Sequence, residues 1–112
     1  MKRVHAVALA IAVVASLVQA QEFPSRPLKF IVPAPPGGAP DAVARVVGQR
    51  LSTQLGQQVV VENRGGGNGI IGSEAAARAP ADGYTMVIGY AGPFSINPGL
   101  VANLPYDVVK DF

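Results

Sequence analysis

The sequence has no cysteine and no tryptophan, and it has only one histidine, His5. Without cysteine the chain forms no disulfide scaffold, and a zinc site built from Cys or His clusters is excluded. Because His5 lies close to the N-terminus, the serines further along the chain have no other histidine to act as a base, which excludes a Ser–His catalytic arrangement among them. Only 14% of the residues are charged and the acidic ones are scattered, so no carboxylate pair for acid–base catalysis is predicted.

The first twenty residues have the pattern of a secretion signal. Lys2 and Arg3 precede an almost wholly apolar run from Val4 to Val18, and Val18-Gln19-Ala20 supplies the small residues that signal peptidase prefers. The run is shorter than the ~20 residues that span a membrane comfortably, although an uncleaved anchor is the alternative. We expect residues 1–20 to be removed and the mature chain to begin at Gln21, outside the cytoplasm.

The excess of positive charge comes largely from this signal. Nine Lys and Arg residues face seven Asp and Glu residues, and removal of Lys2 and Arg3 leaves seven of each. The remaining chain has neither basic clusters nor aromatic platforms. A nucleic-acid partner is therefore not predicted.

Apolar runs and helical patterns alternate along the rest of the chain. Strands are predicted at residues 28–32, 59–63 and 85–89, and helices at about 40–55 and 70–78. This order is typical of right-handed crossovers on a parallel sheet. The sequence therefore predicts an α/β fold in which the loops after the three strands share one edge, where ligands of open α/β sheets bind.

Two helices have features of their own. In the first, Val43, Val47 and Leu51 lie four apart with Val46 beside them, which is the apolar stripe of a helix packed on one face. A further short helix is expected at residues 94–102, broken by Asn97-Pro98-Gly99.

The most informative stretch is Pro35-Pro36-Gly37-Gly38-Ala39-Pro40-Asp41, between the first strand and the first helix. The first N–H groups of a helix have no partner within it, and the helix dipole is positive there. Paired glycines let a carboxylate approach the backbone. This predicts an anion site, with a purely structural turn as the alternative. Because Asp41 would repel an anion, it is expected to cap or order the loop, or to contact a ligand amine or hydroxyl.

A second glycine-rich segment, Gly67-Asn68-Gly69-Ile70-Ile71-Gly72, matches the G-x-G-x-x-G pattern of dinucleotide sites. The acid expected about 20 residues further on is missing, so a turn with close helix packing is favoured. Arg64 is expected to pair with Glu62 or Asp82, with a ligand contact as the alternative.

Four segments together resemble the extracytoplasmic solute-binding proteins of tripartite tricarboxylate transporters, the Bug or TctC family. They are Phe30–Gly38 with Asp41, Val59–Arg64, Ala79–Thr85, and Ile96-Asn97-Pro98 with Leu104–Asp107. The resemblance implies a periplasmic, monomeric, non-catalytic receptor without cofactor or metal. Such a receptor closes two α/β domains on a small carboxylate and delivers it to membrane transporter subunits.

The resemblance also implies where this chain belongs in such a receptor. Residues 21–112 would be the incomplete N-terminal part of domain 1, the βαβαβ portion of a type II periplasmic-binding-protein-like fold, truncated. The loops after the first and third strands would hold a ligand carboxylate through backbone groups and water. The positions carried over as ligand-binding are Ala34, Pro35, Gly37, Gly38, Asp41, Tyr90, Ala91 and Asn97.

The chain departs from the family pattern at two places in these loops. Ala39-Pro40 stands where members often have glycine and a small polar residue, and Tyr90 stands where a small hydroxyl residue is frequent. These differences bear on the identity of the ligand more than on the fold. Two alternatives remain: a secreted α/β enzyme with catalytic residues beyond Phe112, and a truncated chain without function.

Overall fold

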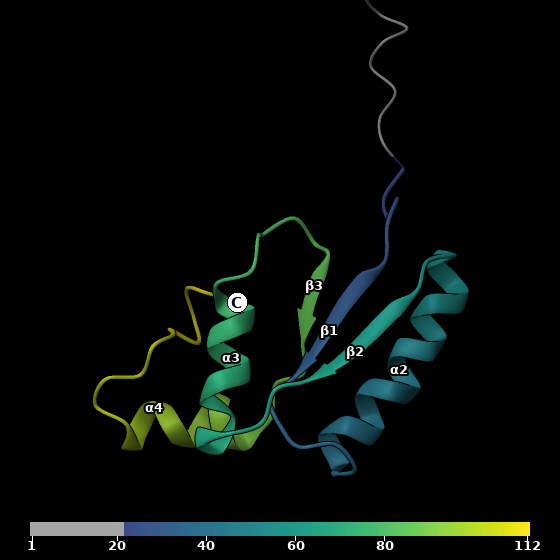
Figure 1. The fold of residues 1–112 in the computed structure, drawn as a ribbon. Helices are drawn as coiled ribbons and strands as arrows, with labels where there is room; N and C mark the ends of the chain where they lie inside the picture. The colour runs from purple at the N-terminus through teal and green to yellow at the C-terminus, as the bar shows by residue number, and fades with distance from the viewer. Residues whose placement is uncertain (1–21) are drawn as a thin grey trace, which may run out of the picture.

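A parallel three-stranded sheet forms the centre of the molecule. The computed structural model describes residues 22–112, so the predicted signal peptide and Gln21 lie outside the described residues. Strands β1 (Leu28–Val32), β2 (Val59–Asn63) and β3 (Thr85–Val87) lie in the order β2-β1-β3 (Figure 1). The helical segments are α2 (Ala39–Leu55), η1 (Gly67–Gly69), α3 (Ile70–Ala77), η2 (Gly92–Ile96) and α4 (Asn97–Leu100). The predicted α/β fold is confirmed.

The register brings the carboxyl ends of the three strands to one edge. β1 pairs with β2 from Leu28 opposite Val59 to Val32 opposite Asn63, and Ile31 lies opposite Val87 of β3. β3 ends two residues before the predicted limit, although the Ile88 amide still donates to the Ile31 carbonyl at 3.1 Å. Helices α2 and α3 both begin at this edge, at the bottom of Figure 1.

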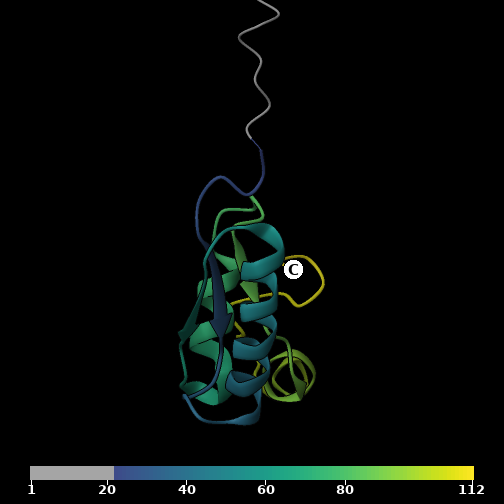
Figure 2. The same cartoon turned by 90° about the vertical axis from the view of Figure 1, so that its right-hand side faces the viewer.

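The core lies between the sheet and α2. Phe30, Val32 and Ala34 from β1 and its loop are buried together with Ala44 of α2. Side chains alternate along a strand, so Ile31, which is 2% exposed, lies on the opposite face, where α3 packs against β1 and β3. Figure 2 shows α2 lying along the sheet. Among residues 22–112, no helix is long and apolar enough to cross a membrane.

The face of α2 that packs on the sheet differs from the predicted apolar stripe. The buried positions of α2 are Asp41, Ala44 and Gly48, whereas Val43 and Val46 are 52% and 65% exposed. The expectation that the valines form the packing face was therefore wrong. Small residues replace them because the helix lies so close to β2: a Cβ on Gly48 would lie 3.4 Å from Val59 Cγ1.

The last helical region begins two residues earlier than predicted and is continuous. η2, a π-helical turn at Gly92–Ile96, continues directly into α4 at Asn97–Leu100. The expected break at Asn97-Pro98-Gly99 is absent, because Pro98 lies in the first turn of α4, where its missing N–H is tolerated.

Candidate carboxylate site at the sheet edge

The loop between β1 and α2 presents backbone donors to solvent. Pro33 and Ala34 are buried, whereas residues 35–39 are exposed. Prolines have no N–H, so the backbone donors of this exposed stretch are the amides of Gly37, Gly38 and Ala39, and the Gly37 amide donates to Asp41 Oδ2 at 2.8 Å. Gly37 has φ 89°, in the left-handed region that favours glycine. Gly38 and Ala39 donate to none of the described residues, and they stand at the positive end of the 17-residue helix α2.

Asp41 faces its own loop rather than solvent. It is 4% exposed, and its Oδ2 accepts hydrogen bonds from the Gly37 amide at 2.8 Å and from Arg45 Nε at 3.1 Å. Its Oδ1 lies 3.0 Å from Arg45 Nε and accepts no hydrogen bond from the described residues. The Arg45 guanidinium, followed by the Gly37 amide, lowers the pKa of Asp41 to about 2. Of the roles predicted for Asp41, ordering the loop is the one that this geometry shows.

Two residues that the sequence analysis did not single out complete this contact. Arg45 donates through a terminal nitrogen to Asn63 Oδ1 at 3.2 Å, and Asn63 Nδ2 donates to the Ala34 carbonyl at 3.2 Å. The i,i+4 spacing of Asp41 and Arg45 was a signal for the ion pair. Nothing in the sequence pattern indicated Asn63, because its part depends on the sheet register.

The loops after β1 and β2 pack together through glycines. A Cβ on Gly65 would lie 3.0 Å from the Pro35 nitrogen, and one on Gly72 would lie 2.7 Å from Pro33 Cα. Gly69 has φ 86°, and its Cβ would meet the Pro33 carbonyl oxygen at 3.0 Å. The segment with the G-x-G-x-x-G spacing thus surrounds the start of the candidate loop, which supports close packing over dinucleotide binding.

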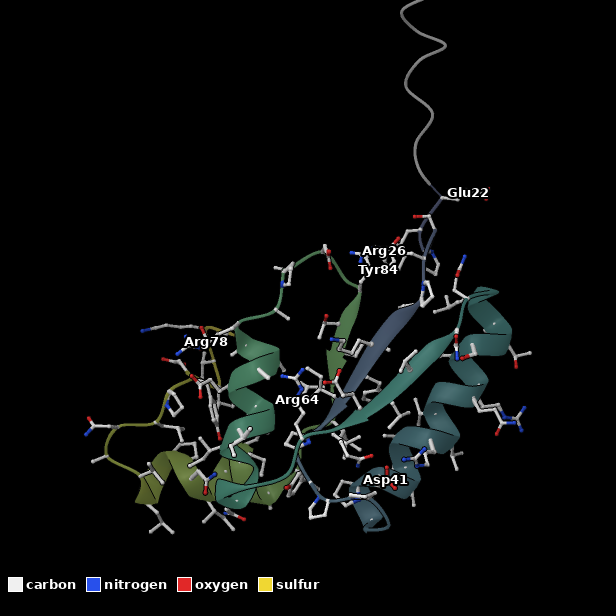
Figure 3. All side chains as sticks on the ribbon, in the orientation of Figure 1. Glu22, Arg26, Asp41, Arg64, Arg78 and Tyr84 are labelled. Carbon is white, nitrogen blue, oxygen red and sulfur yellow. The ribbon has the colours of Figure 1, made fainter. Side chains whose placement is uncertain are left out.

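Arg64, which precedes those glycines, has a structural partner. It forms an ion pair with Glu62, and Glu62 also lies 3.2 Å from Lys29 Nζ. The hydrogen bond from Arg64 is the largest cause of the lowered pKa of Glu62. The other candidate partner, Asp82, pairs with Arg26 at 2.8 Å. Figure 3 shows Arg26 and Tyr84 at the opposite end of the sheet from Asp41.

The loop after β3 is joined to the first loop by Tyr90. The Tyr90 hydroxyl donates to the Pro33 carbonyl at 2.6 Å, and burial raises the pKa of this phenol. Ala91 is exposed, directly before η2. Tyr90 and Ala91 therefore lie beside the first loop, as the family resemblance implied for ligand-binding residues, and their contact with a ligand stays a prediction.

Asn97 is engaged by the second glycine segment. It is 3% exposed, its Oδ1 accepts a hydrogen bond from Asn68 Nδ2 at 2.8 Å, and its Nδ2 donates to the Asn68 carbonyl at 3.1 Å. Asn68 has φ 53°, a conformation that asparagine tolerates better than most residues. Asn97 thus orders this turn, and its predicted ligand contact stays untested.

The eight predicted ligand-binding residues form two groups by their contacts. Those of the first loop are joined to Tyr90 through Pro33, whereas Asn97 is bonded to Asn68 of the second glycine segment. The members are Ala34, Pro35, Gly37, Gly38, Asp41, Tyr90 and Ala91 in one group, and Asn97 in the other. Within residues 22–112 there is no group of three or more His, Cys, Asp or Glu side chains that could hold a metal ion.

Comparison with known proteins gives a consistent result. A family profile, "Tripartite tricarboxylate transporter family receptor", matches residues 43–112. The chain is 45% identical over 107 residues to a UPF0065 protein from the tcbD-tcbE intergenic region of Pseudomonas sp. (strain P51), covering 93% of this chain and 32% of that protein. It is 43% identical over 104 residues to BugT of Bordetella pertussis, covering 92% and 32%. The chain thus spans about a third of the length of these relatives.

Solved structures share the fold. The periplasmic binding protein BugD matches with a TM-score of 0.76 and 41% identity, covering 80% of this chain and 30% of that one. MatC from Rhodopseudomonas palustris with bound malate matches with a TM-score of 0.76 and 34% identity, covering 80% and 31%. Rpa4515 of R. palustris with adipate matches with a TM-score of 0.75 and 38% identity, covering 79% and 29%. The α/β arrangement described above is therefore part of the architecture of periplasmic binding proteins.

Proposed function

The chain belongs to the tripartite tricarboxylate transporter receptor family, and on that premise we propose that it forms the carboxylate-binding edge of a periplasmic solute receptor. The family is one of transporter receptors rather than of enzymes. In this proposal residues 1–20 direct export and residues 21–112 belong to the first of two domains. The receptor is a monomer that hands its ligand to membrane transporter subunits.

The observation that carries the proposal is the pair of amides at Gly38 and Ala39. Both are exposed and donate to no described residue, and both stand where the dipole of α2 favours negative charge. An ionised acid is costly to remove from water unless it is paired or hydrogen-bonded. Backbone donors that are already fixed in position meet this need without a positively charged side chain in contact with the ligand.

The class of ligand follows from the relatives and from the open form of the site. MatC with malate and Rpa4515 with adipate are both complexes with small dicarboxylic acids, so malate and adipate are the first acids to test.

The loop residues 35–39 are exposed, whereas ligand sites bury most of the ligand surface. We therefore propose that a second lobe closes over this edge by a hinge.

Substitution of Gly38 tests the role of the loop. Gly38 has φ −83°, close to the value that proline fixes, so Gly38→Pro removes one N–H donor without a large change of φ at this position. Loss of a hydrogen bond to a charged group costs about 1.5–3 kcal/mol, so we expect Kd for the acid to rise by roughly ten- to hundredfold. Gly38→Ala is the matched control, because it keeps the amide and its Cβ would lie no closer than 3.7 Å to another heavy atom.

The measurement is a titration of the purified, ¹⁵N-labelled protein with malate and then adipate, following the amide signals by NMR. Saturable shifts of the residue 38 and Ala39 amides in wild type and in Gly38→Ala, with the Ala39 amide of Gly38→Pro saturating only at roughly ten- to hundredfold higher acid concentration, would support the proposal. Wild-type protein that melts cooperatively and shows no shift at these amides with either acid would contradict it. Equal affinity in the proline and alanine variants would remove the loop from the site.

A further inference from the structure

We propose that Arg45 and Asn63 are positioning residues that hold the carboxylate-binding loop in place and cancel the negative charge of Asp41 beneath it. Neither residue touches the proposed ligand position directly. Both act through Asp41 and the backbone of the loop. This inference rests on the proposed function and adds the reason why an acidic residue can stand at an anion site.

The contacts connect three elements of the fold. Arg45 on α2 donates to Asp41 at the start of the same helix and to Asn63 at the end of β2. Asp41 holds the tip of the loop through the Gly37 amide at 2.8 Å, and Asn63 holds its start through the Ala34 carbonyl at 3.2 Å. The free donors, Gly38 and Ala39, lie between Gly37 and the first turn of α2. The bond between Gly37 and Asp41 therefore holds the chain on both sides of these two amides, and the bond from Asn63 holds the loop at Ala34.

The charges in this network explain how an anion can be accepted. Asp41 is buried, and its lowered pKa of about 2 keeps it ionised at neutral pH. An uncompensated carboxylate at this position would offset the positive potential of the helix N-terminus and repel an incoming acid. Arg45 Nε lies 3.0 Å from one carboxylate oxygen and 3.1 Å from the other. Among the described residues, Arg45 is the only cation paired with Asp41.

The Gly37 amide adds a second point in favour of positioning. This N–H is spent on Asp41, so it is not available to a ligand in this arrangement. Its bond instead holds Gly37 at φ 89°, directly before the two amides that donate to no described residue. The family resemblance placed Gly37 among the ligand-binding residues, and the geometry assigns it a part in shaping the loop.

Four variants separate positioning from simple helix stabilisation. Arg45→Gln removes the positive charge, and Arg45→Lys keeps it but lacks the planar guanidinium group. The double variant, Arg45→Gln with Asp41→Asn, removes both charges. Arg50→Gln is the matched control, because Arg50 is another exposed arginine of α2. Each is titrated with malate and adipate by the amide shifts of Gly38 and Ala39, and hydrogen exchange of the Gly37 amide is measured without ligand.

We expect Arg45→Gln to weaken acid binding by roughly tenfold or more and to speed exchange of the Gly37 amide. Arg45→Lys should keep part of the affinity, Arg50→Gln should keep all of it, and the double variant should regain part of what Arg45→Gln loses. A role limited to helix stability would lower the melting temperature and leave the affinity and Gly37 exchange unchanged.

The outcomes that overturn the inference differ from those that overturn the proposed function. If wild type binds an acid and Arg45→Gln binds it equally well, the inference fails and the receptor proposal stands. If the double variant binds no better than Arg45→Gln, charge cancellation is wrong. If Gly37 exchange is the same in wild type and Arg45→Gln, positioning is wrong. Wild type that binds neither acid contradicts the proposed function itself.

Discussion

Asp41 is buried at the edge of the sheet, where its carboxylate accepts hydrogen bonds from the Gly37 amide and from Arg45 and so orders the loop before α2. The repulsion between an acid and an anionic ligand was enough to predict that Asp41 caps or orders the loop, or contacts a ligand amine or hydroxyl, and the structure shows the ordering role. The partners could not be predicted in full. Asn63 meets Arg45 and Ala34 only because β2 lies beside β1 with Val32 opposite Asn63. Family resemblance named positions of the loop, and the contacts that order them came from the structure.

Asp41 also predicts how stability depends on pH. Its pKa is about 2 in the folded protein, against an ordinary value of 3.8 for an aspartate side chain. A group with a depressed folded-state pKa contributes stability that is fully present above the unfolded value and is lost as pH falls through the folded value. The contribution of Asp41 should therefore decline between about pH 4 and pH 2, and Asp41→Asn should be less stable than wild type at neutral pH.

Urea unfolding of wild type and Asp41→Asn across this range measures the effect. Glu62 and Asp107 also have lowered pKa values, so both proteins should lose stability in acid, and the difference between them is the informative quantity. We expect the two curves to converge as pH approaches 2. Curves that stay parallel from neutral pH to pH 2 would show that the Asp41 contacts do not stabilise the fold.

At the level of secondary structure, strands were easier to predict than packing faces. The strands at 28–32 and 59–63 have the predicted limits, because short runs rich in β-branched and aromatic residues lie between proline- and glycine-rich stretches. The buried face of α2 was missed because hydrophobicity pointed to the valines, whereas close approach to the sheet required Ala44 and Gly48. A helix near residues 94–102 was predicted, but the break expected within it was wrong, because Pro98 and Gly99 are typical helix-ending residues and yet lie inside the helical region at residues 92–100.

Substitution of Gly72 tests whether α3 must pack closely against the loop after β1. In Gly72→Ala the new Cβ would lie 2.6 Å from the Arg64 carbonyl oxygen and 2.7 Å from Pro33 Cα. Both are backbone atoms that cannot move alone, so we expect a loss of about 1–3 kcal/mol in the free energy of unfolding. Gly99→Ala is the matched control, because its Cβ would meet no atom within 4 Å, and it should stabilise α4 by up to ~1 kcal/mol.

Chemical denaturation of the two variants and wild type makes this comparison. The steric explanation requires Gly72→Ala to fall below wild type and Gly99→Ala to match or exceed it. A Gly72→Ala protein of wild-type stability would mean that the loops after β1 and β2 can separate at little cost. In that case the glycine segment would not fix the start of the candidate ligand loop.

For the whole molecule, the pattern of elements and the set of motifs predicted the fold class and the family, and both are confirmed. The parallel order β2-β1-β3 brings the loops from distant parts of the chain to one edge, which is why motifs separated in sequence identify a single site. The apolar stripe of α2 was predicted but its exposure was not, because hydrophobicity along the chain does not state which side of a helix packs on the sheet. The exposed surface is formed by Ala42, Val43, Val46 and Val47 on the outer face of α2.

That α2 surface predicts how the purified chain behaves in solution. Val43, Val46 and Val47 are 52%, 65% and 40% exposed, and contiguous exposed apolar patches promote association between proteins. We expect sedimentation velocity to show concentration-dependent self-association, and Val46→Ser to shift the population toward monomer. Its free energy of unfolding should stay within about 0.5 kcal/mol of wild type, because the side chain is exposed.

Val60→Ser on β2 is the matched control for this experiment, because Val60 is 44% exposed and lies outside the α2 surface. It should leave the self-association unchanged if α2 is the contact. Equal effects of the two substitutions would indicate non-specific association of the chain. A wild-type protein that stays monomeric at every concentration would show that the exposed valines of α2 do not cause self-association. This outcome would agree with the monomer that the family resemblance implies.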